Sequence, residues 1–289
     1  METEEPKKKH KLLNIILFLM LSFVVLIMYS RYLGTKGLVV KEYRISSNNL
    51  PLSFSGVKIV HISDLYIKNK SSISNLGNIV EKANILKPDI VIFTGNLLDT
   101  ANKLNETDYE KISSLLNSLH TTIGKYAVKG KRDYNQKYDN IIANSGFKVL
   151  NNESDIAYYK SNSPIFIGGL DCNKPDIASM YEYYISNSET DIQKAEYKII
   201  LTSKGDYAEK LINNDATVNL ILAGNSLNGG VVLPVFGGLF IPEGSKKYYA
   251  PYYKVGATEI YISSGIGTDR HPYRLFNKPS FNFYRMKSL

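Results

Sequence analysis

The sequence predicts an α/β domain that follows a single N-terminal membrane-spanning helix. An uncharged apolar run begins at residue 12, and short β-branched segments then alternate with segments of helical periodicity. Several of the short segments end in Gly or Ser, as strands do where a loop leaves a sheet. The 289 residues are 44% hydrophobic and 21% charged, which is typical of a folded protein and argues against a disordered or fibrous chain.

The first expected element is the apolar run at residues 12–29, LLNIILFLMLSFVVLIMY. As a helix it would span about 27 Å, close to the thickness of the hydrocarbon core of a bilayer. The basic residues before it predict a cytoplasmic tail at 1–11, a transmembrane anchor at 12–30 and a single-pass protein of the cell membrane with its domain on the outer face. A cleaved signal peptide is the alternative, although its apolar core is usually shorter and no small-residue cleavage site follows here.

After the anchor, residues 31–54 are interpreted as a tether and residues 55–289 as one α/β domain. Helical spacing of apolar residues is seen before Leu86 and over 106–119. Short runs rich in Val, Ile and Leu predict strands at 57–63, 89–95, 125–129, 164–170, 197–203, 218–223 and 259–265. This alternation of strands and helices is typical of an α/β domain.

Cysteine content and charge exclude several classes of protein. The single cysteine, Cys172, rules out an internal disulfide and is interpreted as a structural thiol, and with only four histidines a Cys/His zinc module is excluded. The net charge of +8 is spread along the chain, without the basic stripe and motif of a nucleic-acid binder. An anionic membrane surface or an anionic ligand is at least as plausible a partner for this charge.

The loops at the expected strand ends carry a recognisable series of motifs. In order they read SDLY (63–66), TGNLLD (94–99), VKGKRDY (128–134), LTSKGDY (201–207) and LAGNSLNGG (222–230), followed by the tail SSGIGTDRHPYRLFNKP (263–279). Together with VKIVHISDL and KPDIVIFTG, this series resembles the calcineurin-like metallophosphoesterases, in particular their membrane-anchored bacterial branch. The resemblance covers residues 55 to about 285. It implies a four-layer α/β/β/α sandwich and a two-metal hydrolase site built from D-x-H, G-D, G-N-H-[DE], a single His and G-H-x-H.

The positions that would form this site depart from the family pattern almost throughout. Asp64 is the Asp of D-x-H and is the one metal-ligand position left intact, and the acid that closes G-N-H-[DE] is kept as Asp133. The other seven motif positions carry a different residue. They are the His of D-x-H (here Tyr66), the Asp of G-D (Asn96), the Asn and His of G-N-H-[DE] (Lys131 and Arg132), the single His (Lys204) and the two His of G-H-x-H (Asn225 and Leu227). We call Asp64, Asp133 and these seven replaced positions the vestigial site.

The replacements remove the chemistry that a two-metal hydrolase needs. Such a site requires several ligands that converge on two cations and generate hydroxide from bound water. Protonated Lys and Arg side chains have no lone pair to donate and repel a dication. Arg132, at the place of the proton-donating His, has a pKa far too high for acid–base work near neutral pH. We therefore expect no catalytic residue, no metal and no other cofactor. The alternative is an active phosphoesterase that holds Mn, Fe or Zn in a non-standard site.

Three cations stand in the vestigial site, and they can be interpreted in two ways. Lys131, Arg132 and Lys204 contribute +3 against the −2 of Asp64 and Asp133. They could pair with these carboxylates and stabilise the loops alone. They could instead form a pocket for an anion, because Lys and Arg bind phosphate without a metal. The partner would then be an anionic envelope ligand, or a protein that contacts the retained fold.

The segment SKKYYAPYYKVG (245–256) is rich in Tyr and Lys. Such a composition suits a membrane–water interface or a sugar surface. It equally suits a segment whose Tyr rings cover the edge of a sheet. Elsewhere, His61 lies in an apolar strand and is expected to be a buried residue beside the site, whereas His271 is expected in an exposed loop.

Overall fold

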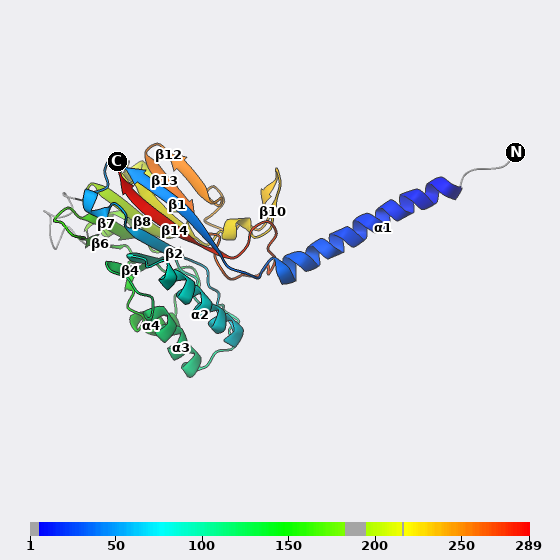
Figure 1. The fold of residues 1–289 in the computed structure, drawn as a ribbon, viewed down its shortest axis with the longest axis horizontal. Helices are drawn as coiled ribbons and strands as arrows, with labels where there is room; N and C mark the ends of the chain where they lie inside the picture. The colour runs from blue at the N-terminus through cyan, green and yellow to red at the C-terminus, as the bar shows by residue number, and fades with distance from the viewer. Residues whose placement is uncertain (1–5, 183–194, 216) are drawn as a thin grey trace.

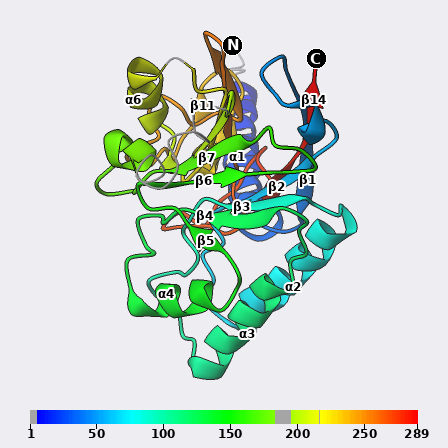
Figure 2. The ribbon, with the colours of Figure 1, turned by 90° about the vertical axis from the view of Figure 1, so that its left-hand side faces the viewer.

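The computed structural model describes residues 6–182, 195–215 and 217–289. Two six-stranded sheets pack against each other, and helices cover both outer faces (Figures 1 and 2). This arrangement confirms the predicted four-layer α/β/β/α sandwich.

The first sheet has the strand order β1–β14–β2–β3–β4–β5. Its strands are β1 (Val39–Ser47), β14 (Ser280–Ser288), β2 (Lys58–Ile62), β3 (Ile90–Phe93), β4 (Gly124–Ala127) and β5 (Lys148–Val149). Strands β2 to β5 are parallel, so the loops that follow them leave the sheet at one edge. Strand β14 is antiparallel to β2, and β1 is parallel to β14.

The position of β1 corrects the predicted tether. Residues 39–47 form a nine-residue strand at the edge of the first sheet, paired along its whole length with β14 from the other end of the chain. Leu50 and Phe54, also assigned to the tether, are buried between the sheets. The prediction that the domain begins at residue 55 was therefore wrong. An edge strand buries few side chains, and its partner is distant in sequence, so local apolar periodicity does not reveal it.

The second sheet has the order β12–β13–β9–β8–β7–β6. Its strands are β12 (Tyr252–Val255), β13 (Thr258–Ile262), β9 (Leu220–Gly224), β8 (Tyr197–Lys204), β7 (Ile165–Gly169) and β6 (Glu153–Ala157). The four inner strands are parallel, and the two edge strands are antiparallel to their neighbours. A short hairpin of β10 (Val232–Leu233) and β11 (Gly237–Gly238) lies outside both sheets.

Apolar side chains fill the three spaces between the layers. The inner faces of the two sheets meet through β-branched and Leu side chains such as Ile59, Ile92 and Leu222, all fully buried. On the outer face of the first sheet lie α2 (Lys70–Ile85), α3 (Glu106–Asn117) and α4 (Gln136–Ala143), whereas α6 (Tyr207–Asn214) and a helical segment at 177–182 cover the second sheet (Figure 2). Asn69 and Asn105 start α2 and α3 through complete capping boxes.

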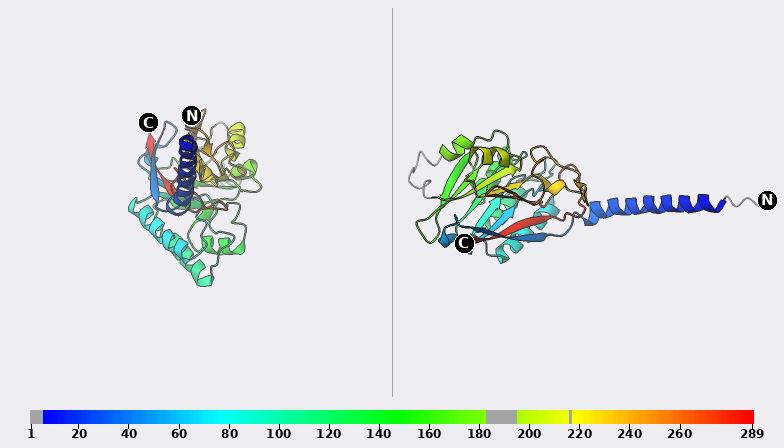
Figure 3. Two further views of the ribbon diagram at one scale, coloured as in Figure 1. Left: turned by 90° about the vertical axis from the view of Figure 1, so that its right-hand side faces the viewer. Right: turned by 90° about the horizontal axis from the view of Figure 1, so that it is seen from above.

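Helix α1 (Pro6–Met28) stands apart from the domain, and a π-helical turn at Tyr29–Leu33 connects it to the chain that follows (Figures 1 and 3). The continuous helical stretch Lys11–Leu33, which includes the π-helical turn, has a mean hydropathy of 2.7 in its most apolar window, and none of that window is buried. Exposure on all sides excludes a core helix of the domain. Among the described residues, this is the one helix long and apolar enough to cross a membrane.

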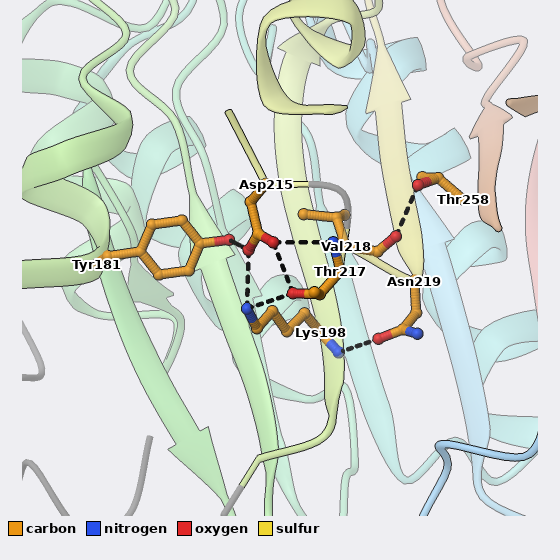
Figure 4. A network of polar contacts seen from close by, with 7 residues as sticks. All are labelled: Tyr181, Lys198, Asp215, Thr217, Val218, Asn219 and Thr258. Carbon is orange, nitrogen blue, oxygen red and sulfur yellow. Dashed lines mark hydrogen bonds and ion pairs between the residues drawn. The ribbon is translucent and has the colours of Figure 1, made fainter. Parts of the chain in front are cut away.

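A polar network closes the end of the second sheet between β8 and β9 (Figure 4). The Asp215 carboxylate accepts hydrogen bonds from Lys198 Nζ at 2.7 Å, Tyr181 Oη at 2.6 Å, and both the Oγ1 and the backbone N–H of Thr217. Burial alone would raise the pKa of Asp215, but the donors of Lys198, Thr217 and Tyr181 outweigh it and hold this pKa well below its usual range.

We expect Asp215→Ala to lower the free energy of unfolding by about 1–3 kcal/mol at neutral pH, because it leaves the Lys198 ammonium without its carboxylate. The carboxylate's pKa is lower in the folded chain than in the unfolded one. Its contribution is therefore present above about pH 4 and is lost as the pH falls below it. Urea unfolding at neutral and acidic pH measures both effects. Glu209→Ala, which removes the half-exposed partner of Lys247, is the control and should change stability by less than about 1 kcal/mol. Equal effects of the two substitutions would contradict the prediction.

Candidate functional site

The loops that follow β2, β3, β4, β8 and β9 meet at one end of the sandwich around a cavity of about 1130 Å³. All seven replaced positions of the vestigial site line this cavity: Tyr66, Asn96, Lys131, Arg132, Lys204, Asn225 and Leu227. Asp64 and Asp133 are fully buried in the same loops. The structure therefore brings together the positions that the sequence motifs predicted.

Asp64 is held by neutral N–H donors. Its Oδ1 accepts a hydrogen bond from Asn96 Nδ2 at 2.8 Å, and its Oδ2 accepts one from the backbone N–H of Asn225 at 2.9 Å. Burial raises the pKa of Asp64 to about 6, and these donors oppose that shift. Both carboxylate oxygens are thus already bonded to protein donors.

Asp133 ties the loop after β3 to the loop after β4. Its carboxylate accepts hydrogen bonds from the backbone N–H groups of Asn96 at 2.6 Å, Leu97 at 2.9 Å and Gly130 at 2.8 Å. Burial raises the pKa of Asp133 to about 7, against the effect of the three N–H donors. Asp133 is fully buried and is not among the residues that line the cavity, so its carboxylate holds the two loops together rather than facing a ligand.

Arg132 binds neither retained carboxylate. Its guanidinium donates to Thr100 Oγ1 at 2.6 Å, forms an ion pair with Asp269 and lies 5.4 Å from the centre of the Tyr66 ring. The interpretation in which the three cations pair with Asp64 and Asp133 is therefore wrong for Arg132, because its partner comes from the C-terminal tail. Asp269 is a residue of this cavity that the sequence motifs did not single out.

The two lysines of the site also have partners other than Asp64 and Asp133. Lys131 Nζ lies 3.5 Å from Glu243 Oε2, and both side chains are largely exposed. Lys204 Nζ lies 3.5 Å from Tyr207 Oη and 5.6 Å from the centre of that ring. The pairing interpretation is wrong for these residues too. Both lysines line the cavity, and the partners of their ammonium groups lie 3.5 Å away.

The buried Arg274 supports the loops and was missed by sequence reasoning. Its guanidinium is fully buried and donates to the carbonyl oxygens of Ser264, Gly265 and Gly267, and more weakly to that of Asn277. Burial lowers the pKa of Arg274 to about 10, so it remains a cation at neutral pH. Its only signal was its place in the tail motif, which does not show which carbonyls it binds.

The backbone of the site is held in an unusual conformation. Five residues of the vestigial site have left-handed φ angles: Asp64 (53°), Tyr66 (44°), Asn96 (61°), Asn225 (63°) and Leu227 (49°). Asp, Asn and His are the non-glycine residues most often found there, whereas a bulky Tyr or Leu is a genuine outlier. Such strain clusters at functional sites. The side chains at 66 and 227 therefore do not favour the conformation that these loops adopt.

The residues present do not fit the two metal ions that the family implies. The groups that meet the Asp64 carboxylate are N–H donors, and Asn96 Oδ1 lies 3.4 Å from the backbone N–H of Arg132. Burial raises the pKa of the Tyr66 phenol well above its usual value, so it stays protonated. Within the described ranges, no group of three or more His, Cys, Asp or Glu side chains is placed to hold a metal ion.

The remaining candidate residues have structural surroundings. His61 is fully buried, with its ring nitrogens 2.8 Å from Thr94 Oγ1 and 3.3 Å from Tyr284 Oη, as expected of a core residue beside the site. Cys172 is a buried free thiol. His271 is exposed and stacks on Phe240.

The Tyr-rich segment 245–256 covers the edge of the second sheet. It includes the edge strand β12, and Tyr248 is buried against Tyr253 in an edge-to-face contact. The Tyr253 hydroxyl accepts hydrogen bonds from the backbone N–H groups of Tyr249 and Ala250. These contacts support the second of the two interpretations of this segment.

Comparison with known proteins places this fold and this site in a family. The calcineurin-like phosphoesterase profile matches residues 57–228. The uncharacterized metallophosphoesterase YkuE of Bacillus subtilis is 29% identical over 267 residues, which cover 90% of this chain and 89% of that protein. A transmembrane protein with a metallophosphoesterase domain from Danio rerio is 23% identical over 253 residues, which cover 83% of this chain and 55% of that protein.

Among solved structures, the NAD nucleotidase of Haemophilus influenzae superimposes with a TM-score of 0.46 at 13% identity, over 73% of this chain and 45% of that one. The motif loops at the strand ends, the two-sheet sandwich and the matched profile lead to one assignment. This chain belongs to the calcineurin-like phosphoesterase family.

Proposed function

We propose that this protein is a membrane-anchored calcineurin-like domain that does not hydrolyse phosphate esters and instead binds an anionic envelope molecule in the cavity of the vestigial site. The observation that carries the proposal is the state of Asp64. Both of its carboxylate oxygens accept N–H hydrogen bonds, and side-chain cations line the cavity where metal ions would be needed. A protein ligand is the competing occupant of the same cavity.

The membrane topology is part of this proposal. The apolar Lys11–Leu33 helix would cross the cell membrane once, with the basic residues that precede it on the cytoplasmic side. Residues from about 34 onward would then lie on the outer face, where phosphate-bearing envelope molecules are found. The Danio rerio relative is a transmembrane protein by name, which is consistent with an anchored domain here.

Lys204 is the residue best placed to bind an anion. Lys204 lines the cavity, and the partner of its ammonium is the neutral phenol of Tyr207, so an incoming phosphate would not have to displace a carboxylate. Lys131 also lines the cavity and forms a largely exposed pair with Glu243, which is weak in water. A phosphate held by two such ammonium groups would gain charge-assisted hydrogen bonds without a metal.

We expect the full chain, solubilised in detergent, to bind inorganic phosphate in the presence of a chelator, because the cations of the site are side chains. Lys204→Ala should weaken binding about tenfold, and Lys204→Glu should weaken it further because it reverses the charge. Rising salt should weaken binding by screening. Calorimetric titration measures all three effects.

The matched control for this titration is Lys111→Glu, an equal charge reversal at an exposed position of α3 outside the cavity. It should bind phosphate as the unmodified chain does. Absence of heat from the unmodified chain at low salt, or equal loss in Lys111→Glu and Lys204→Glu, would overturn the anion-binding proposal.

A further inference from the structure

We propose that the β10–β11 hairpin is a membrane-contacting surface that inserts its tip into the bilayer that α1 spans. We define this membrane-contacting surface as Val235, Phe236 and Leu239 of the hairpin together with Phe276 of the neighbouring loop. The inference rests on the membrane anchor of the proposed function but not on the anion site.

The hairpin is apolar and exposed. Residues 229–242 contain no polar or charged side chain. At the tip, Val235 is 101% exposed and Phe236 is 81% exposed, and Leu239 and Phe276 are exposed by 51% and 75%. A cluster of large apolar side chains in water is unfavourable for a soluble domain and marks a surface that meets another apolar phase.

A short series of contacts connects the hairpin to the end of the anchor. The backbone N–H of Arg274 donates to Ser30 O at 3.0 Å, and Gly34 lies so close that a Cβ there would be 1.9 Å from Arg274 O. The next residue, Leu275, accepts a hydrogen bond from the backbone N–H of Val232 at 3.0 Å. The chain at 274–275 is thus packed between the C-terminal end of the anchor and the start of the hairpin. Figures 1 and 3 show the hairpin at the side of the domain from which α1 departs.

The backbone at two exposed positions opposes the residues found there. Val235 and Phe276 have φ angles of 71° and 54°, in the left-handed region that favours Gly or Asn. A β-branched or aromatic residue is strained in this conformation, and the exposed Val235 side chain gains no burial within the chain to offset the strain. Burial of these side chains in a contact outside the chain would offset the cost of the strained backbone.

Charge near the anchor favours a bilayer over a protein as that contact. Arg31 and Lys36 flank the junction at Gly34, and Arg270 and Lys278 flank the loop that carries Phe276, all with exposed side chains. The side chains of these basic residues can pair with the phosphates of lipid headgroups while the apolar side chains insert among the acyl chains. Leu239 also lines the cavity, so docking of the hairpin would place the mouth of the cavity near the lipid headgroups.

The single buried cysteine makes the inference directly testable, because a cysteine introduced at the surface can be labelled selectively. The full chain is reconstituted in nanodiscs of phosphatidylcholine and phosphatidylglycerol and labelled with a bimane fluorophore in three variants, Val235→Cys, Leu52→Cys and Phe18→Cys. Leu52 is the matched control: it is an apolar residue, 81% exposed, in the turn next to the C-terminal end of β14, at the opposite end of the domain.

Lipids brominated on their acyl chains should quench the fluorophore at positions 18 and 235 and leave it unchanged at position 52. Quenching at 18 with none at 235 would overturn the membrane-contacting surface while the anchor stands, and it would leave a protein partner as the occupant. No quenching at 18 would overturn the anchor and this inference together. Phosphate titration of the same preparations reports on the anion site independently.

A second variant separates contact from folding. In the Val235→Cys background, Phe276→Glu and Phe236→Glu should reduce the quenching at 235, because each places a charge among the acyl chains. Both side chains are exposed, so the melting temperature should stay the same. Full quenching in both variants with unchanged melting would overturn the proposal.

Discussion

Restoring the family's ligands at the seven replaced positions should produce a chain that binds about two divalent ions and hydrolyses an aryl phosphate. The variant combines Tyr66→His, Asn96→Asp, Lys131→Asn, Arg132→His, Lys204→His, Asn225→His and Leu227→His. Removing a group that only supports a metal ligand typically lowers metal affinity or activity by about 10–100-fold. Restoring the ligands themselves should therefore raise activity at least about 100-fold over the unmodified chain.

The backbone explains why this change should be tolerated. Positions 66, 96, 225 and 227 already have left-handed φ angles, in which Asp and His are commoner than Tyr or Leu. The carboxylate introduced at position 96 would face Asp64, where Asn96 Nδ2 now donates a hydrogen bond. Two buried carboxylates repel each other without a cation, so the melting temperature of the restored chain should fall when a chelator is added.

Elemental analysis, an aryl phosphate assay and thermal melts with and without chelator measure these effects. The control adds Asp64→Ala to the restored chain and should abolish metal binding and activity. Stoichiometric metal and metal-dependent hydrolysis in the unmodified chain would refute the proposed loss of catalysis. A restored chain that folds without binding metal would show that the loops no longer present ligands as the family does.

Removal of the Arg274 guanidinium should lower the free energy of unfolding by about 3–5 kcal/mol. Arg274→Met keeps an unbranched apolar stem but is shorter than arginine, and it leaves the carbonyl oxygens of Ser264, Gly265 and Gly267 without their buried donor. Arg274→Lys keeps a charge, but its ammonium ends a shorter side chain and has no second nitrogen for the Asn277 carbonyl oxygen, so an intermediate loss of about 2 kcal/mol is expected.

Urea unfolding of the full chain measures these losses. Arg285→Met is the control, because Arg285 is half-exposed in an ion pair with Glu42 on the same sheet, and its removal should change stability by less than about 1 kcal/mol. If Arg274→Met and Arg285→Met have equal effects, the buried guanidinium does not support the loops as its contacts indicate.

The inner strands and the first two helices of the domain could be predicted from sequence because they carry a local signal. Strands such as β3 and β9 are continuous apolar runs, buried on both faces. Strand β1, in contrast, has mostly exposed or half-buried side chains and pairs with β14 from the far end of the chain. No local pattern encodes such a pairing, so the predicted domain began too late.

In the vestigial site, too, some features follow from local sequence and others from long-range contacts. The sequence by itself determined the family, the fold class and the identity of each replaced ligand. Each motif residue at a strand end can be compared with the family pattern at its own position, without knowledge of its contacts. Only the tertiary structure decided the partners of the cations. Arg132 pairs with Asp269, 137 residues away, rather than with Asp64, which is held by two N–H donors. Ion pairs form between whichever side chains the folded loops bring together, and that choice depends on distances that the order of residues does not contain.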